Sequence, residues 1–248
     1  MRRFTYLVCI LGVLFFITSC SSMDTSRVKK VDKAAVAIVG VEKHINYTDD
    51  FEIPQLVQRL AQSDKFDLQP IAENLHENTF GVYTEVMPFT LIPEEEVIET
   101  ERYKNFELYN EGYEEATDGN SNFITVKNYK KYNPSGMLQG RRAKLFEAMP
   151  DEAEAMLMVG LSYKLFQENS MIPGVNKGKI EADLDIRLVK PNGERILTIN
   201  KKAESDNSMK VVLDAAILDP DKIQPLVQDA TDKAMAKAEE FIQDNLSD

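Results

Sequence analysis

Residues 180–202, IEADLDIRLVKPNGERILTINKK, alternate apolar and polar side chains on both sides of a Pro-Asn-Gly turn signal. Alternation with a period of two is typical of a β-strand with one buried face, and Asn-Gly favours a type I′ hairpin turn. With Asn192 and Gly193 as the loop, Leu188 faces Leu197 on the core side. A slip by one residue would expose this apolar row, so the sequence specifies the register of the hairpin.

The polar row of the same hairpin places Asp185 opposite Asn200 and Asp183 opposite Lys202, on the face that we expect to meet solvent. Three acids on this row, with Glu181 as the third, could hold a calcium ion. Because Lys202 faces Asp183, we favour a solvated ladder of paired charges and expect no metal site.

Apolar runs elsewhere predict the other long elements. Residues 34–41, AAVAIVGV, are almost continuously apolar, which predicts a central strand covered on both faces. Residues 156–166, MLMVGLSYKLF, predict a second strand. Residues 219–245 repeat apolar side chains at helical spacing, which predicts a long C-terminal amphipathic helix with Pro225 in its first turn. We therefore expect an α/β fold, with α+β as the alternative: a mixed sheet containing the hairpin, flanked by helices.

Shorter signals lie between the first strand and residue 90. Two aspartates before Pro54 mark a helix start, since proline in the first helical turn loses no hydrogen bond. Pro88 confines its neighbourhood to the edge or end of a sheet. The predicted elements are a helix from Pro54, a short strand at 66–70, a short helix at 71–76 and a strand at 81–90.

The region 93–146 separates its charges. Residues 93–118 contain ten acids and two bases, whereas residues 119–146 contain six bases and no acid. One interpretation is that the two halves complement each other within the fold. The other is that the region forms a binding surface with both positive and negative charge for a partner, because tyrosine and arginine are favoured at protein interfaces. Glycines and prolines here predict an irregular insertion, with helical turns at 141–148. The candidate partner-binding residues are Tyr103, Tyr109, Tyr113, Lys130, Arg141 and Arg142.

The chain begins with MRRFTYLVCILGVLFFITSC, residues 1–20. Two arginines precede an apolar run of 15 residues, which is shorter than the roughly 20 residues that a membrane-spanning helix needs. A charged start, a short apolar core and small residues at the exit indicate an export signal. The alternatives are an uncleaved single-span anchor and a secretory signal that is cut before Ser21.

The exit Ile17-Thr18-Ser19-Cys20 resembles the lipobox of bacterial lipoproteins. The resemblance implies that residues 1–19 are a signal peptide and that Cys20 carries a diacylglycerol thioether and an acylated amino group, with chains such as palmitate. Serine after the cysteine implies the outer membrane, where we expect the domain to face the periplasm. Residues 20–33 then form a lipidated polar tether, and residues 34–248 form a single domain.

Composition narrows the classes of function. Loss of the two N-terminal arginines with the signal changes the formal net charge from −12 to −14. Such an acidic surface repels nucleic acid, so we expect no nucleic-acid partner. Cys9 leaves with the signal and Cys20 is lipidated, so no thiol remains for a disulfide and stability depends on core packing.

Catalytic motifs are absent from the sequence: it contains no G-x-S-x-G, H-E-x-x-H or C-x-x-C. Residues 174–179 look like a phosphate loop but lack one residue between the glycines, and Ile180 replaces the magnesium-binding Ser or Thr. Only His44 and His76 could supply imidazole ligands, and His44 is expected in a surface loop. We expect no cofactor and no catalytic residue, although a triad assembled from distant residues would leave no local motif.

Two short segments resemble known lipoprotein domains. Residues 153–160 precede a hairpin that includes residues 187–194, much as in the curli-secretion lipoprotein and the activators of peptidoglycan synthases. The resemblance implies a noncatalytic adaptor or assembly role, and residues 88–148 depart from it. We expect a lipid-anchored module that binds another envelope protein. The alternatives are a carrier or chaperone for a small apolar ligand, and an envelope hydrolase with a nonlocal site.

Overall fold

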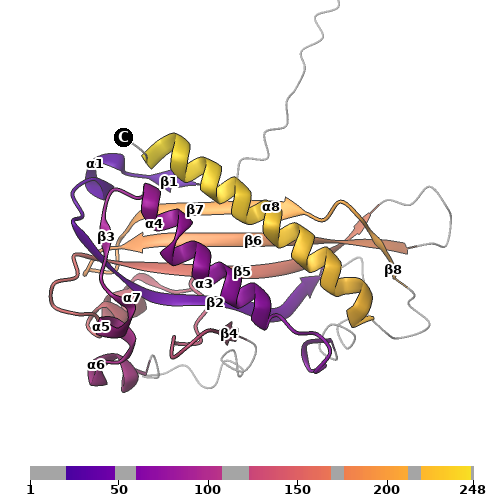
Figure 1. Cartoon of the computed structure of the whole chain (residues 1–248), viewed down its shortest axis with the longest axis horizontal. Helices are drawn as coiled ribbons and strands as arrows, with labels where there is room; N and C mark the ends of the chain where they lie inside the picture. Colours follow the sequence, from indigo (N-terminus) through magenta and orange to yellow (C-terminus); the bar gives the residue numbers. More distant parts are fainter. Residues whose placement is uncertain (1–20, 48–59, 108–122, 169–175, 212–218, 247–248) are drawn as a thin grey trace, which may run out of the picture.

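The hairpin lies inside one large mixed sheet in the computed structural model (Figure 1). The structure describes residues 21–47, 60–107, 123–168, 176–211 and 219–246. Six strands follow one another across the sheet, in the order β1 (Ser22–Met23), β7 (Arg195–Glu204), β6 (Asn176–Val189), β5 (Ala155–Glu168), β2 (Lys33–Tyr47) and β3 (Thr90–Leu91). Two short strands complete the described sheet: β4 (Phe123–Thr125) pairs with β2, and β8 (Met209–Val211) pairs with β6.

The sheet is mixed because β2 runs parallel to both β5 and β3, whereas the other described pairs are antiparallel. A parallel pair needs a long crossover, and the chain between β2 and β5 supplies it with helices and short strands. Residues 34–39 are buried on both faces of β2, which confirms the strand predicted from AAVAIVGV. The predicted strand at 156–166 is confirmed as β5.

The predicted register of the hairpin is confirmed, since Leu188 pairs with Leu197 and Asp183 with Lys202. The predicted type I′ turn is wrong. Within the turn only Gly193 has a positive φ, at +75°. Its amide donates to the Lys190 carbonyl at 2.8 Å, and the Lys190 amide donates to the Glu194 carbonyl at 2.9 Å. This is a three-residue loop with glycine in the left-handed position, and a register shift next to Leu188 restores the predicted pairing.

The polar row of β6 does not face solvent along its whole length, contrary to our expectation. Asp185 and Arg187 are 4% and 7% exposed. The Arg187 guanidinium holds both carboxylate oxygens of Asp185, at 2.9 and 2.7 Å, and donates to the Pro134 carbonyl at 2.6 Å. The loop around Pro134 therefore covers this end of the strand. Nearer the other end the predicted charge ladder is confirmed by an ion pair of 3.2 Å between Lys202 and Asp183.

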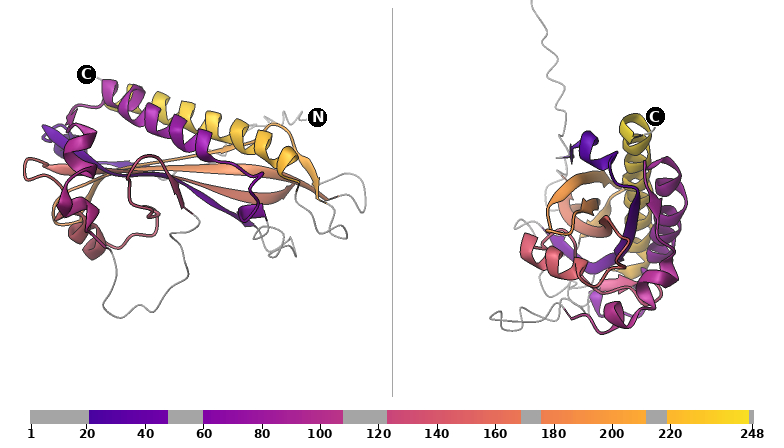
Figure 2. Two further views of the ribbon diagram at one scale, coloured as in Figure 1. Left: turned by 60° about the horizontal axis from the view of Figure 1, so that its bottom comes forward. Right: turned by 90° about the vertical axis from the view of Figure 1, so that its left-hand side faces the viewer.

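Helices cover the opposite face of the sheet. The predicted C-terminal helix is confirmed as α8 (Pro220–Leu246), which lies across β6 and β7 beside α3 (Gln69–Phe80) and α4 (Val82–Val86) (Figure 2). Alanines at 230, 234 and 238 are fully buried, which allows a close approach to the sheet, and Tyr163 of β5 shares a hydrogen bond of 2.9 Å with Thr231. Pro225 lies inside the helix rather than in its first turn.

Some of the elements predicted between residues 49 and 90 are confirmed and others are wrong. The helix at 71–76 is confirmed within α3, whereas residues 66–70 form no strand. The strand predicted at 81–90 is wrong: half of it is α4, and only Thr90 pairs in the sheet, together with Leu91. Apolar residues at 82, 83 and 86 also fit helical spacing, and packing against α8 selects the helix, with Tyr83 fully buried. The helix predicted from Pro54 lies mostly outside the described residues.

Residues 21–33, expected to form a free tether, are folded onto the domain. Ser22–Met23 form β1 at the outer edge of β7, and Thr25–Val28 form the short helix α1. Val28 and Val31 are fully buried, so this polar segment contributes two side chains to the core. Along the described chain, no helix is long and apolar enough to cross a membrane.

Candidate functional site

The region 93–146 was the predicted contact surface, and its described parts are α5 (Glu94–Ile98), α6 (Glu101–Lys104), β4 and α7 (Gln139–Phe146). Helix α5 begins directly after Pro93 with three glutamates in its first turn, and α7 confirms the helical turns expected near residue 141. These elements lie along the lower edge of the sheet in Figure 1, near β2 and β4. Tyr109 and Tyr113 lie outside the described residues.

Tyr103 of α6 is fully buried and does not belong to a contact surface. Its hydroxyl donates to the Ala37 carbonyl of β2 at 2.7 Å and accepts from the Lys130 amide at 2.9 Å. Burial raises the pKa of this phenol. Tyr103 therefore joins α6 and the loop after β4 to the central part of the sheet.

Lys130 is half-buried above Tyr103, with its ammonium 5.5 Å from the ring centroid and 2.7 Å from the Lys104 carbonyl. Burial lowers the pKa of the Lys130 ammonium. The Asn128 amide likewise donates to the Glu99 carboxylate at 2.8 Å, and Lys127 pairs with Glu94. Residues after β4 thus contact the acidic half inside the fold. These contacts support the first of our two interpretations of the charge separation.

Arg142 is also structural rather than a surface contact, since it is 6% exposed. Its Nε donates to the Gly193 carbonyl at 2.8 Å, and its terminal nitrogen donates to the Met137 carbonyl. Burial, with Arg195 and Arg187 nearby, lowers the pKa of this guanidinium. The Gln139 side chain adds a hydrogen bond of 3.2 Å to the Asn192 carbonyl, so α7 is fastened to the hairpin turn.

The exposed face of α7 carries the part of the predicted surface that stays accessible. Arg141 and Lys144 are exposed there at a spacing of three residues, so they are neighbours on the helix surface, and the exposed Leu138 precedes the helix as its N-cap residue. Leu138 is 61% exposed and is the one large hydrophobic side chain that is exposed in the described chain. The sequence did not single it out, because an exposed leucine at a helix start has the same local pattern as a core leucine.

A second cluster joins α3, α5 and the turn after β4. His76 Nε2 lies 2.5 Å from Glu94 Oε1, and the other oxygen of Glu94 pairs with Lys127, whose φ of 50° is left-handed. Glu94 is 7% exposed, and burial, followed by the charge of Lys127, lowers the pKa of His76. The ring of His76 also packs on Phe80 and Tyr129. Among the described residues, the hydrogen-bond partner of His76 is the Glu94 carboxylate.

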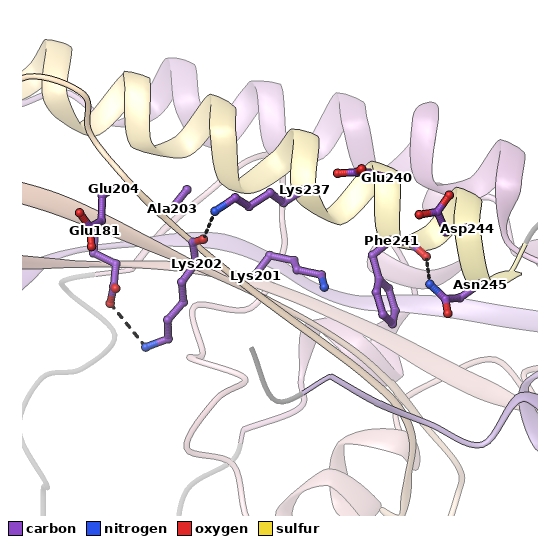
Figure 3. Close-up of a pocket in the computed structure, with 10 residues that line it drawn as sticks. All are labelled: Glu181, Lys201, Lys202, Ala203, Glu204, Lys237, Glu240, Phe241, Asp244 and Asn245. Carbon is purple, nitrogen blue, oxygen red and sulfur yellow. Dashed lines mark hydrogen bonds and ion pairs between the residues drawn. The ribbon is translucent and has the colours of Figure 1, made fainter. Parts of the chain in front are cut away.

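A groove of about 560 Å³ lies between the end of β7 and the C-terminal half of α8 (Figure 3). Lys237 of α8 donates to the Lys202 carbonyl at 2.8 Å, and Lys201 lies over the ring of Phe241 at 4.0 Å. The residues that line the groove are mainly charged, and this lining does not favour an apolar ligand. They are Glu181, Lys201, Lys202, Ala203, Glu204, Lys237, Glu240, Phe241, Asp244 and Asn245.

Within the described ranges, no group of three or more His, Cys, Asp or Glu side chains could hold a metal ion. Residues 176–179 of the phosphate-loop-like segment belong to strand β6. The lipidation candidate Cys20 lies outside the described residues. His44 lies within strand β2 rather than in a surface loop.

The segment that follows Cys20 is attached to the sheet from its first residue. The Ser21 hydroxyl contacts both the amide and the carbonyl of Asn200, at 3.4 and 3.5 Å. The Asp24 amide donates to the Ile196 carbonyl at 3.0 Å, and the Asp24 carboxylate caps α1 by accepting from the Arg27 amide.

A charged contact fastens α1 to the hairpin turn. Arg27 forms a two-pronged ion pair with Glu194, at 2.5 and 2.8 Å, beside the turn residue Gly193. The hydrogen bond from Arg27 is the main reason that the pKa of Glu194 falls to about 2. Sequence reasoning missed this attachment because residues 21–33 are mostly polar, and the two buried valines are the only local signal for it.

Comparisons with known proteins identify no family. No family model matches the chain, and no curated protein matches it. A solved structure from Helicobacter pylori, described as a homologue of a neuraminyllactose-binding hemagglutinin, is distantly similar: the alignment has 11% identity, covers 85% of each chain and has a TM-score of 0.31.

Proposed function

We propose that this chain is a lipid-anchored envelope lipoprotein that binds another envelope protein and catalyses no reaction. The proposal of a lipid anchor is based on the lipobox-like segment that ends at Cys20. We propose that this anchor lies in the outer membrane and that the domain faces the periplasm. The resemblance of residues 153–160 and 187–194 to lipoproteins of curli secretion and peptidoglycan synthesis agrees with an assembly role.

One observation carries the binding function. Leu138, the N-cap residue of α7, is 61% exposed, and two exposed cations, Arg141 and Lys144, follow it within the helix. An apolar side chain flanked by two cations is suited to an acidic partner surface with an apolar residue at its centre. We therefore propose that the contact surface within residues 93–146 is the exposed side of α7 with Leu138, instead of the tyrosines that the sequence suggested.

Substitution tests this surface better than deletion, because Tyr103 and Arg142 hold the fold together and removal of 93–146 would take both away. We would crosslink intact cells and purify the partners of the Leu138→Glu/Arg141→Glu variant. The matched control is Lys222→Glu, a charge reversal on the exposed side of α8. We expect the double variant to lose partners that the control retains.

An unchanged set of crosslinked partners, at equal abundance of folded protein, would sink the proposed contact surface. The anchor is tested separately by metabolic labelling with an alkyne-bearing palmitate. The wild type should be labelled and Cys20→Ala should not, since Cys20 is the one residue to which the lipobox assigns the lipid.

A further inference from the structure

The edge of the sheet beside β1 holds the residues that directly follow Cys20. Ser21 is hydrogen-bonded to Asn200, and Ser22 pairs with Thr198. Consecutive Cα atoms are about 3.8 Å apart, so the residue that carries the proposed lipid can lie only about that far from a residue fixed on the sheet. A tether of about a dozen extended residues could hold a domain some 40 Å from a membrane, and the folded segment removes this freedom.

Charge distinguishes this edge from the rest of the domain. Residues 20–33 contain four bases and two acids, whereas residues 34–248 have a net charge of −16. Lys29 and Lys30 are exposed directly after α1, next to the corner where Arg27 holds the hairpin turn. Basic residues close to an anchor are attracted to anionic headgroups, whereas a strongly acidic surface is repelled.

Helices α5 and α6, which follow β3 in the chain, lie apart from this corner. Strand β3, at the far edge of the sheet in strand order, is separated from β1 by four strands. Helices α5 and α6 lie below the far edge in Figure 1, whereas α1 and β1 lie along the upper edge.

We infer that the face formed by β1, the outer edge of β7 and α1 lies directly on the lipid surface, so that the domain is held in one orientation with α5 and α6 directed away from the membrane. This inference rests on the proposed lipid anchor at Cys20. It does not depend on the identity of the protein partner. The physical basis of the inference is that residues 21–33 are folded onto the sheet instead of forming a free tether, together with the basic charge of residues 20–33.

Fluorescence quenching tests the orientation on the full lipidated protein. The acylated Cys20 has no free thiol, so a single introduced cysteine can be labelled at Thr198→Cys on the near edge or at Glu101→Cys on α6. The labelled protein is reconstituted into vesicles of phosphatidylethanolamine and phosphatidylglycerol that contain a headgroup-nitroxide lipid. Thr198 is distant from the anchor in sequence and close to it only in the fold.

We expect the label at position 198 to lose most of its fluorescence and the label at 101 to keep it. A label at Lys30→Cys should behave like the label at 198. Equal quenching at 198 and 101, or stronger quenching at 101, would overturn the orientation. Flotation of the protein with the vesicles reports the anchor itself, so failure of the proposed lipidation appears as protein that does not float. An equal-quenching result with floating protein refutes the orientation alone.

Discussion

Substitution of Gly193 by alanine should destabilise the domain by about 2–4 kcal/mol. At its φ of +75°, any L-residue with a side chain loses roughly 1–2 kcal/mol relative to glycine. The new Cβ would lie 2.1 Å from the Gln139 carbonyl oxygen and 2.9 Å from the Ala143 amide nitrogen. Both are backbone atoms of α7, so relief requires the helix to move.

Movement of α7 would stretch the hydrogen bond of 2.8 Å from Arg142 to the Gly193 carbonyl. A buried hydrogen bond with a charged donor contributes about 1.5–3 kcal/mol. The smaller entropy of an unfolded chain with alanine returns about 0.4–1 kcal/mol. The net loss of stability follows from these three contributions, and it is a large share of the roughly 5–15 kcal/mol by which such domains are stable.

Urea unfolding followed by circular dichroism measures this loss. The matched control is Gly140→Ala on the same helix, where an added Cβ meets no atom within 4 Å. Because alanine is the better helix former, the control should be neutral or stabilised by up to about 1 kcal/mol. A Gly193→Ala variant within about 0.5 kcal/mol of wild type, the usual range for unimportant surface positions, would refute the close contact between the hairpin turn and α7.

Further predictions concern the hydroxyl of Tyr103 and the pKa of Glu194. Tyr103→Phe leaves the Ala37 carbonyl and the Lys130 amide without their partner and should lower the unfolding free energy by about 2 kcal/mol. The control is Tyr83→Phe, because the buried hydroxyl of Tyr83 has no hydrogen-bond partner among the described residues. This control should change the unfolding free energy little. The opposite ranking in urea titrations would contradict the assigned role of Tyr103. Because the pKa of Glu194 is lowered from 4.5 to about 2, its pairing with Arg27 stabilises the fold above pH 4.5 and is lost as the pH falls toward 2. The stability difference between wild type and Glu194→Gln should therefore disappear over that interval, and a difference that grows on acidification would exclude the pairing.

The long elements were predictable because each repeats its apolar residues over many positions. The register of β6 on β7 follows from alternation alone, and the alanine-rich stripe of α8 from helical spacing. Short segments were less predictable. Residues 82–86 fit either a strand or a helix, and only contact with α8 decides between them.

The site was harder to predict than the fold. Tyr103 and Arg142 belong to residue types that are enriched at interfaces, yet both are buried through long-range hydrogen bonds that no local pattern reveals. Asp185 and Arg187 occupy the polar row of a strand, and the loop that covers them is about 50 residues away in the chain. Leu138 was missed because sequence spacing cannot show that a leucine is exposed.

The central claim is that the chain folds onto the sheet edge directly after Cys20, the proposed anchor residue. A disulfide between Ser22→Cys and Thr198→Cys tests it most directly, since these residues pair across β1 and β7 and the proposed lipoprotein has no other free thiol. In the anchored protein under mild oxidation, we predict rapid and nearly complete formation of the 22–198 disulfide, and little for the control pair Ser22→Cys with Glu101→Cys. Equal, slow crosslinking of both pairs would mean that residues 21–33 form a free tether, which would contradict the account.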